Sequence, residues 1–389
     1  MVHWLSWTLS NGKRSKLFGM VRLLAILVSF AAISLCAQQS EIARFDAAMA
    51  QEGVVVTNGM KWIDGRCLPI EGRAFTDVDH YYDRLPSDVT TNVNAGVRAM
   101  KHHTAGMQFR FTTDSRRLAL KWIPYNAGLS MDHMPATGVS GVDIYRRDAA
   151  NGRWRYVKTG RIWDAHQGGS LEIPWTPGEA CLINLPLYNG VKSVTLGVET
   201  NATVSALAPR SNGVVKPVVF YGTSITHGGC CSRPGMSFVN IVGRELDVPV
   251  VNLGFSGSGR MEFEMSEHLA RIDASCYVLD TLWNMNDSLV EERYEPFIRN
   301  LRAKRPGVPI VMVEFYSVHS EWQSSMDRTI RELYEKLLSE GWDHLFYLPR
   351  RGMYVDDEGT VDGVHPNDWG MVSLAKGFEK SIREALELK

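Results

Sequence analysis

Hydrophobic and polar residues alternate with a period of two along much of the first half of the chain. A strand with one buried face has this period, and short strands separated by turns are typical of a β-sandwich or jelly roll. Turn-forming pairs such as Asn151-Gly152 and Asn189-Gly190 separate the alternating segments. The alternating segments lie at 107–111, 118–122, 142–145 and 194–198. The pattern predicts an all-β sandwich domain, like a jelly roll, over residues 40–210.

From about residue 214 the pattern changes to continuous apolar runs that alternate with amphipathic segments of helical length. The apolar runs lie at 217–221, 248–253, 277–282, 309–313 and 345–348. The amphipathic segments lie at 237–246, 266–272, 289–303, 323–339 and 367–387. Strands that are apolar throughout and alternate with helices predict a parallel sheet covered on both faces. We expect a flavodoxin-like, doubly wound α/β domain with five parallel strands over residues 214–389, joined to the first domain by residues 211–213.

The N-terminal segment has the pattern of a secretory signal peptide over residues 1–37. Basic residues precede a 13-residue apolar run at 23–35, and Cys36-Ala37 forms a small-residue boundary. The run is shorter than the ~20 residues that a membrane span needs. The alternatives are an uncleaved membrane anchor and a lipoprotein attached through Cys36, although Leu35 stands where a lipoprotein needs a small residue. The pattern predicts a secreted or periplasmic protein with no stable membrane span after cleavage.

Composition and charge narrow the class of protein further. Hydrophobic residues make up 44% of the chain, charged residues 22%, and the net charge is −1, which is ordinary globular composition. Without a basic surplus, nucleic acid is not an expected partner. Five of the six cysteines would remain after leader cleavage, and an odd number cannot all pair, so a disulfide scaffold is not expected. The oligomeric state stays open.

Ligands of a doubly wound sheet bind beyond the carboxyl ends of its strands, so the residues there are the candidates for chemistry. Ser224 follows the first apolar run and could present its hydroxyl to a substrate, with its own N–H facing a substrate oxygen. Asp362 and His365 follow the last run, three positions apart; Asp362 could hold the imidazole while His365 takes the serine proton. The alternatives are a turn without chemistry at Ser224 and a helix-capping loop around His365.

Two further strand ends could supply donors for an oxyanion, the negatively charged oxygen formed when a nucleophile adds to a carbonyl. Gly257 lies in the glycine-rich stretch 254–259, whose spacing does not fit the dinucleotide fingerprint. Its N–H could face the same oxygen as that of Ser224, unless the stretch is only a loop that needs positive φ. After the third run, Asn284 and Asn286 both offer an amide. We prefer Asn284; the alternative is a helix cap.

Four large side chains flank these positions and are candidates for substrate binding: Arg233, Arg260, Trp283 and Trp369. Aromatic faces suit sugar rings, but core packing of the tryptophans and surface ion pairs of the arginines are equally good interpretations. His102, His103 and His133 do not form a usual zinc set. We therefore expect neither a metal nor an organic cofactor.

The motifs together resemble the SGNH (GDSL-like) hydrolases over roughly residues 50–389. The four blocks of that family supply Ser, Gly, Asn and Asp-x-x-His, which Ser224, Gly257, Asn284 and the Asp362/His365 pair match in order. One branch carries a preceding β-sandwich with a G-x-D-[LI]-Y motif, matched here at 141–145, and Arg84-Leu85-Pro86 fits it as well. Two blocks depart from the family: 222–224 read Gly-Thr-Ser instead of Gly-Asp-Ser, and 284–287 read Asn-Met-Asn-Asp. The second departure keeps Asn286 as an alternative.

The resemblance implies a serine esterase that works through an acyl-enzyme on Ser224, with an oxyanion hole formed by Ser224, Gly257 and Asn284. Members of the branch with a leading sandwich resemble carbohydrate esterases that remove O-acetyl groups from polysaccharides. Two alternatives remain: an esterase or lysophospholipase acting on non-carbohydrate esters, and a non-catalytic carbohydrate-binding protein on the same fold.

Overall fold

The computed structural model describes residues 54–57, 59–316 and 324–388 of the chain. The predicted signal peptide, with its alternatives at Cys36, lies outside these residues. Residues Val56–Lys389 form one compact unit that holds both the β-rich and the α/β part. The division at 210 and 214 therefore remains a prediction from the sequence.

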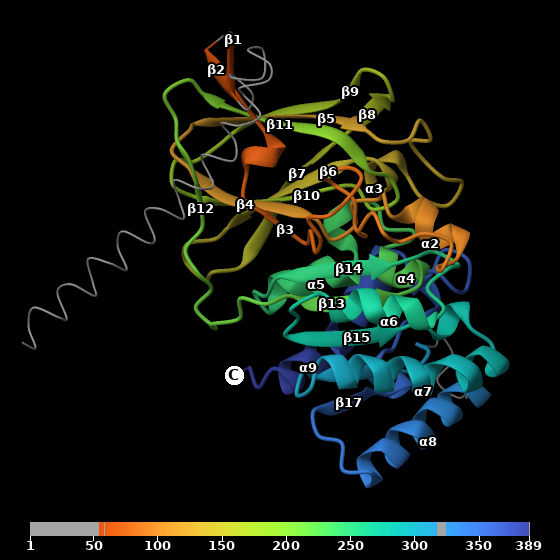
Figure 1. The fold of residues 1–389 in the computed structure, drawn as a ribbon. Helices are drawn as coiled ribbons and strands as arrows, with labels where there is room; N and C mark the ends of the chain where they lie inside the picture. The colour runs from red at the N-terminus through yellow and green to blue at the C-terminus, as the bar shows by residue number, and fades with distance from the viewer. Residues whose placement is uncertain (1–53, 58, 317–323, 389) are drawn as a thin grey trace, which may run out of the picture. The chain divides into compact units, whose positions relative to one another are not determined.

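The β-rich part consists of two sheets with antiparallel pairing (Figure 1). The first has the order β1-β2-β11-β5-β9-β8: β1 (Val54–Thr57), β2 (Met60–Asp64), β11 (Val191–Glu199), β5 (Arg117–Pro124), β9 (Gly168–Pro174) and β8 (Ile162–Asp164). The second has the order β12-β4-β10-β6-β7: β12 (Val204–Ala206), β4 (Gln108–Thr113), β10 (Ala180–Asn184), β6 (Val142–Arg147) and β7 (Trp154–Gly160), with β3 (Ile70–Glu71) paired to β4. The predicted β-sandwich is confirmed.

Alternating side chains of the two sheets meet in one apolar core. Trp122 on β5 is among its largest buried side chains, and its indole N–H donates to the carbonyl of Ser140 at 2.9 Å, which satisfies the buried donor. Phe109 and Phe111, two positions apart on β4, are fully buried in the same cluster. The period of two in the sequence is thus the period at which side chains face this core.

The α/β part is a five-stranded parallel sheet in the order β14-β13-β15-β16-β17, which confirms the flavodoxin-like prediction. Its strands are β13 (Val218–Gly222), β14 (Val250–Gly254), β15 (Cys276–Asp280), β16 (Ile310–Val313) and β17 (Leu345–Leu348). Its helices are α4 (Ser224–His227), α5 (Phe238–Glu245), α6 (Phe263–Ala270), α7 (Asp287–Lys304), α8 (Ser325–Ser339) and α9 (Asp368–Ala385). Two short helices, α2 (Ala95–Met100) and α3 (Ala136–Val139), come from the first half of the sequence, but they bury Val97 and Val139 in the hydrophobic clusters of the α/β part. Short 3₁₀ turns occupy Gly65–Cys67, Pro234–Met236, Leu282–Asn284, Arg350–Gly352 and Asp357–Gly359.

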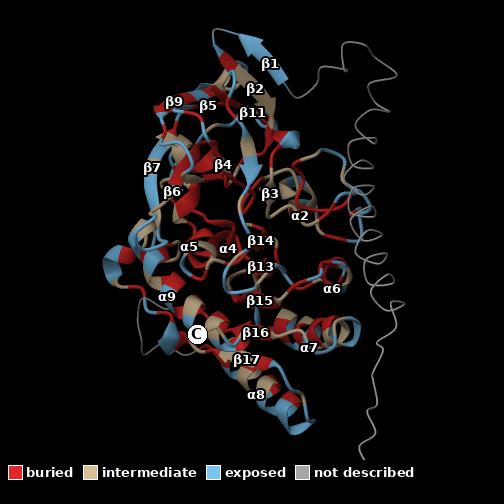
Figure 2. Cartoon of the chain, turned by 90° about the vertical axis from the view of Figure 1, so that its left-hand side faces the viewer, coloured by how far each residue is buried: buried red, intermediate tan, exposed pale blue. Residues whose placement is uncertain are grey.

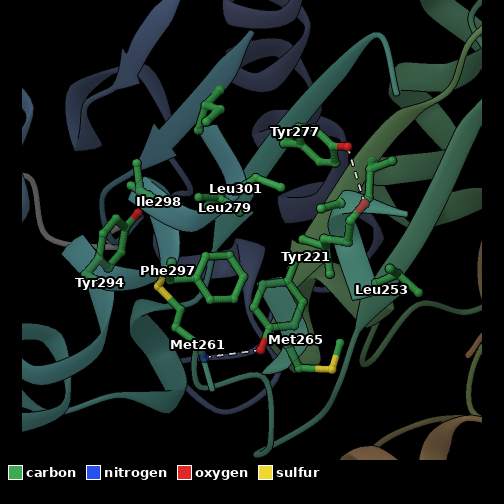
Figure 3. Close-up of a cluster of buried hydrophobic side chains, with 14 of the residues drawn as sticks. Tyr221, Leu253, Met261, Met265, Tyr277, Leu279, Tyr294, Phe297, Ile298 and Leu301 are labelled. Carbon is green, nitrogen blue, oxygen red and sulfur yellow. Dashed lines mark hydrogen bonds between the residues drawn. The ribbon is translucent and has the colours of Figure 1, made fainter. Parts of the chain in front are cut away.

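Both faces of the parallel sheet are buried, which explains why its strands are apolar throughout (Figure 2). Val218 and Phe220 pack in the cluster with α5 and α9, whereas Val219 and Tyr221 pack with α6, α7 and α8. On the second face Tyr221 stacks on Phe297, with ring centroids 5.5 Å apart, and its hydroxyl accepts from the N–H of Met261 (Figure 3). The sheet is therefore fixed between two layers of helices.

A buried aspartate on the sandwich ties the β-rich part to the α/β part. Asp143 on β6, the acidic residue of the 141–145 motif, is fully buried. Its carboxylate accepts from the guanidinium of Arg233 at 2.9 Å and from the N–H of Gly235 at 2.8 Å, and Asn184 donates to its other oxygen. These donors satisfy the hydrogen-bonding capacity of the buried carboxylate. Because Arg233 and Gly235 are two of the donors, Asp143 fixes the turn that follows Arg233.

No helix in the described ranges is both long and apolar enough to cross a membrane.

Candidate active site

Ser224 begins the one-turn helix α4 directly after the carboxyl end of β13. Thr223 caps this helix: its hydroxyl accepts from the N–H of Ile225, and Thr226 completes a capping box. A side chain at Gly222 would lie 2.1 Å from the hydroxyl oxygen of Thr226, so only glycine fits between the strand and the helix. The sharp turn thereby places Ser224 at the edge of the sheet.

Ser224, His365 and Asp362 form a continuous chain of hydrogen bonds. Ser224 Oγ lies 2.9 Å from His365 Nε2, and His365 Nδ1 lies 2.7 Å from Asp362 Oδ2. The other oxygen of Asp362 accepts from the backbone N–H groups of Val364 and His365. The structure therefore brings together all three predicted catalytic residues, with the distances that proton transfer from serine to imidazole requires.

Asp362 is held in its charged form by these donors. Burial alone would raise its pKa, but the backbone N–H of His365, the imidazole and the N–H of Val364 outweigh it, and the pKa lies below the usual value. A charged carboxylate fixes the ring orientation and favours the imidazolium that forms when His365 accepts a proton.

Gly257 lies on the 255–259 loop after β14, with φ +63°, and no atom stands within 4 Å of where its Cβ would be. The residue type is thus dictated by the backbone conformation and not by lack of space. Within the described residues, the N–H groups of Ser224 and Gly257 donate no hydrogen bond, unlike those of Ser258 and Gly259. Both N–H groups are thus available to a substrate oxygen.

The two asparagines take different positions. The side-chain amide of Asn284 donates to the carbonyls of Phe255 at 3.1 Å and Gly259 at 3.3 Å, on either side of Gly257. Asn286 caps α7, with its side chain accepting from the N–H of Leu289. Asn284 is therefore the asparagine in contact with the Gly257 loop, where it holds the loop in shape; its donation to an oxyanion stays a prediction.

The two predicted arginines are not equivalent. Arg233 pairs with Asp143 and also bonds the hydroxyl of Tyr145, so its guanidinium is committed to the contact with the sandwich. Arg260 is exposed beyond the Gly257 loop, and its carbonyl accepts from Arg293. Substrate binding by either arginine stays a prediction.

The two predicted tryptophans also differ. Trp369, the second residue of α9, is 65% exposed and donates its indole N–H to Asp356 at 2.9 Å. Trp283 is half-buried and packs edge-on against Phe315, at 4.9 Å between ring centroids. Of the two, only Trp369 is largely open to solvent, and contact of either tryptophan with substrate stays a prediction.

Arg84 supplies a positive charge behind the Gly257 loop that the sequence did not identify as part of the site. It is 1% exposed and donates to the carbonyls of Asn252 at 3.1 Å, Gly254 at 2.8 Å and Met100 at 2.9 Å. No carboxylate of the described residues pairs with it. Burial lowers the pKa of Arg84 to about 9, so it keeps its proton at neutral pH.

Two neutral histidines lie beside this arginine. Nε2 of His227, three residues after Ser224, is 3.4 Å from the Arg84 guanidinium and 3.3 Å from His103 Nδ1. Burial lowers the pKa of His103 to about 3 and that of His227 well below its usual value. Tyr188 stacks on His227 and donates its hydroxyl to the carbonyl of Ser224 at 3.0 Å. Arg84 is thus the charged member of the group that supports α4 and the loop.

The three histidines considered as metal ligands lie in different environments. His102 pairs with Asp83, His103 with His227, and His133 lies 5.9 Å from His365 between ring centroids. Among the described residues, no three His, Cys, Asp or Glu side chains come together as a metal site would require. Glu314, which follows β16, pairs with Arg331.

Two family models match the chain. Residues 215–383 match the GDSL-like lipase/acylhydrolase family, and residues 60–204 match the N-terminus of SGNH hydrolase-type esterases, a domain with the G-x-D-L-Y motif. Residues 215–383 therefore form a GDSL-like hydrolase domain, and the N-terminal domain of SGNH hydrolase-type esterases precedes it. The chain is an ester-hydrolysing enzyme.

Solved structures with the same fold cover most of the chain. A putative GDSL-like lipase from Bacteroides ovatus is 27% identical, with a TM-score of 0.74 over 85% of this chain and 99% of that one. A salicylyl-acyltransferase from a tetracycline biosynthetic pathway is 17% identical (TM-score 0.69; 86% and 99% covered). A family two carbohydrate esterase from Cellvibrio japonicus is 14% identical (TM-score 0.55; 84% and 98% covered). The last two show the fold alone. No curated protein matches the chain by sequence.

The charge of Arg84 is predicted to assist the reaction through the Gly257 loop. Substitution of Arg84 by Gln removes the charge, whereas Arg84→Lys keeps it. We expect Gln to lower kcat on p-nitrophenyl acetate roughly tenfold with little change in KM, because the charge favours the oxyanion of the transition state, and Lys to retain most of the activity. Thermal melts establish that both variants are folded. Equal losses in the two folded variants would contradict a role for the charge.

Asp280 is predicted to make folding stability depend on pH. Its buried carboxylate accepts the hydroxyl of Thr226 at 2.6 Å, and burial raises its pKa to about 6 from 3.8. The folded state then binds more protons than the unfolded state between these values, so stability falls as pH rises through this range. Asp280→Asn removes this loss. We therefore compare the free energy of unfolding of the variant minus that of the wild type at two pH values. This difference should be larger at pH 7.5 than at pH 4, by on the order of 2–3 kcal/mol.

Urea denaturation at the two pH values measures this difference directly. Asp357→Asn, an exposed substitution in a 3₁₀ turn, is the matched control and should shift stability little at either pH. A constant difference between Asp280→Asn and the wild type across this pH range would show that Asp280 titrates normally.

Proposed function

We propose that the protein hydrolyses O-acetyl esters on carbohydrates through an acyl-enzyme on Ser224. The observation that carries the proposal is the hydrogen-bonded chain from Ser224 through His365 to Asp362 at the carboxyl edge of the parallel sheet. An unactivated serine hydroxyl is a weak nucleophile, and an adjacent imidazole held by a carboxylate is one arrangement that activates it.

The reaction proceeds in two acyl-transfer steps. Ser224 Oγ attacks the ester carbonyl carbon while His365 Nε2 takes the hydroxyl proton. The carbonyl oxygen becomes an oxyanion that accepts from the N–H groups of Ser224 and Gly257, with Asn284 as the third candidate donor. The C–O bond of the ester then breaks, and His365 gives its proton to the leaving alcohol. Water, deprotonated by His365, attacks the acyl-enzyme and releases the acid and Ser224.

Two features support a carbohydrate ester as substrate. His365 and Asp362 are partly exposed, and the indole of Trp369 lies open four residues beyond His365, so a bulky polymer could approach with an aromatic face beside it. Among the structures with the same fold is a family two carbohydrate esterase from Clostridium thermocellum in complex with cellohexaose, 12% identical with a TM-score of 0.52. This likeness shows the fold alone, so the substrate remains a proposal.

Removal of the nucleophile tests the mechanism. Ser224→Ala should abolish turnover of p-nitrophenyl acetate and acetate release from acetylated xylan. The melting temperature should change little, because the bond to His365 is the one hydrogen bond of the Ser224 side chain among the described residues. Ser339→Ala, at the exposed end of α8, is the matched control and should remain fully active. Undiminished hydrolysis by Ser224→Ala would mean that the nucleophile lies elsewhere.

The same assays separate the alternatives. Preference for long-chain acyl esters over acetylated glycans would favour a lipid or other non-carbohydrate ester. A wild type that hydrolyses neither substrate but binds glycans would indicate a carbohydrate-binding protein without activity.

We also propose that the protein is exported through the signal peptide at residues 1–37. Expression of the full chain in a bacterial host with intact secretion should yield a mature form that begins at Gln38, detected by intact mass spectrometry of the periplasmic or extracellular fraction. Recovery of the uncleaved chain from the membrane fraction would instead support the alternative that residues 1–37 are an uncleaved membrane anchor.

A further inference from the structure

A hollow of about 950 Å³ lies on the sandwich beside its contact with the α/β part. β7, β8 and β9 supply most of its lining, and Ser232 and Arg233 of the α/β part complete it. Figure 2 shows exposed residues along β7. The proposed reaction at Ser224 does not use this hollow.

Two aromatic side chains of the hollow are open to solvent. Trp163 on β8 is 78% exposed and Tyr156 on β7 is 49% exposed. Exposed aromatic residues that gather in a concave surface are typical of binding sites and not of packing. Tyr156 is held in place, because the guanidinium of Arg233 lies 4.2 Å from its ring centroid and its hydroxyl bonds Thr159 at 2.9 Å. The hollow therefore offers two exposed aromatic rings, and the ring of Tyr156 is held in place by its contacts.

The charge of the hollow is positive. Its lining includes Lys158, Arg161 and Arg233 but no aspartate or glutamate. Arg233 is neutralised by the buried Asp143, whereas Lys158 and Arg161 make no ion pair with any described residue. Two uncompensated cations beside aromatic rings favour a ligand that carries negative charge as well as apolar ring faces.

The hollow borders the segment that joins His365 to the start of α9. Ser232 in its lining donates its backbone N–H to Asp368 at 2.9 Å, and its hydroxyl bonds the same carboxylate. Asp368 begins α9 three residues after His365. Thr137, also in the lining, donates its hydroxyl to the carbonyl of Ser232 at 2.6 Å. A ligand in the hollow would thus lie next to the segment that carries the general base.

We propose that the hollow binds uronic acid units of an acetylated acidic polysaccharide, while an ester elsewhere on the same chain reaches Ser224. The rings of Trp163 and Tyr156 contact the C–H faces of the sugars, and Lys158 and Arg161 pair with their carboxylates. This inference rests on the proposed function for the bond that is cut, but the binding itself does not require catalysis.

Binding is measured by isothermal titration calorimetry on Ser224→Ala with a galacturonic acid hexamer, cellohexaose and polyglutamate as probes. We expect the galacturonate hexamer to bind at least tenfold more tightly than either of the others, with an affinity that falls as salt rises. In the Ser224→Ala background, Trp163→Ala should reduce this affinity at least tenfold. The double substitution Lys158→Gln and Arg161→Gln should reduce both the affinity and its salt dependence. Lys380→Gln, an exposed substitution on α9, is the matched charge control.

Three binding results would overturn the inference. The first is equal affinity for the galacturonate hexamer and cellohexaose, which would remove the role of the carboxylates. The second is equal affinity for polyglutamate, which would indicate general attraction of anions. The third is unchanged binding by Trp163→Ala when its melting temperature matches that of the parent.

Kinetics distinguish failure of this inference from failure of the proposed function. With an otherwise wild-type chain, Trp163→Ala should leave kcat/KM on p-nitrophenyl acetate unchanged and lower kcat/KM on acetylated oligogalacturonide at least fivefold, mainly through KM. If Trp163→Ala cleaves both substrates with the kcat/KM of the wild type, the hollow is not used and the inference is wrong. If the wild type cleaves neither substrate, the proposed function is wrong, and the calorimetry alone decides whether the hollow binds acidic glycans.

Discussion

Parallel pairing of the five strands is the constraint on which the candidate active site depends. The strands β13, β14 and β15 run side by side in register, so Gly222, Gly254 and Asp280 lie at one edge of the sheet. Residues that immediately follow these strands, such as Ser224 and Gly257, must then lie near one another although more than 30 positions separate them. The chain returns to this edge once more with Asp362 and His365. These groups are too far apart in the sequence for a local interaction to bring them together. The parallel sheet places them near one another.

Charge is distributed around this edge in an unusual way. Buried ionic groups in proteins are normally paired, as Asp143 and Arg233 are. Arg84 and Asp280, by contrast, are buried close to α4, and their hydrogen-bond partners among the described residues are uncharged. Arg84 bonds carbonyls and the neutral imidazole of His227, and Asp280 bonds the hydroxyl of Thr226. Each costs desolvation free energy that an apolar side chain would not. Of the two, only Arg84 has the sign of charge that favours an oxyanion, so its retention is consistent with stability being lost in favour of electrostatic preorganisation.

The sequence allowed the fold and the main positions of the site to be predicted because both depend on local patterns. Continuous apolar runs indicate strands buried on both faces, and the predicted runs coincide with the five strands to within a few residues. Ser224 could be placed because it follows the first strand closely, and Asp362 and His365 because they lie on the segment between the last strand and the last helix. Contacts between residues distant in the sequence could not be predicted. Arg84 lies 168 residues before Asn252, whose carbonyl it bonds, and nothing near Arg233 in the sequence indicates that Asp143 is its partner.

The contacts of Arg233 allow the β-sandwich both to brace the active-site region and to hold a ligand. Its guanidinium joins Asp143 of the sandwich to the segment that follows α4, and it also covers one face of Tyr156. The same side chain therefore fixes the position of the α/β part against the sandwich and the orientation of an aromatic ring in the hollow. Because Ser232, the preceding residue, is bonded to Asp368 at the start of α9, the hollow and the catalytic histidine candidate are held by neighbouring residues. A ligand bound on the sandwich would then meet the reacting groups in one orientation, which is the condition under which binding far from a bond can accelerate its cleavage.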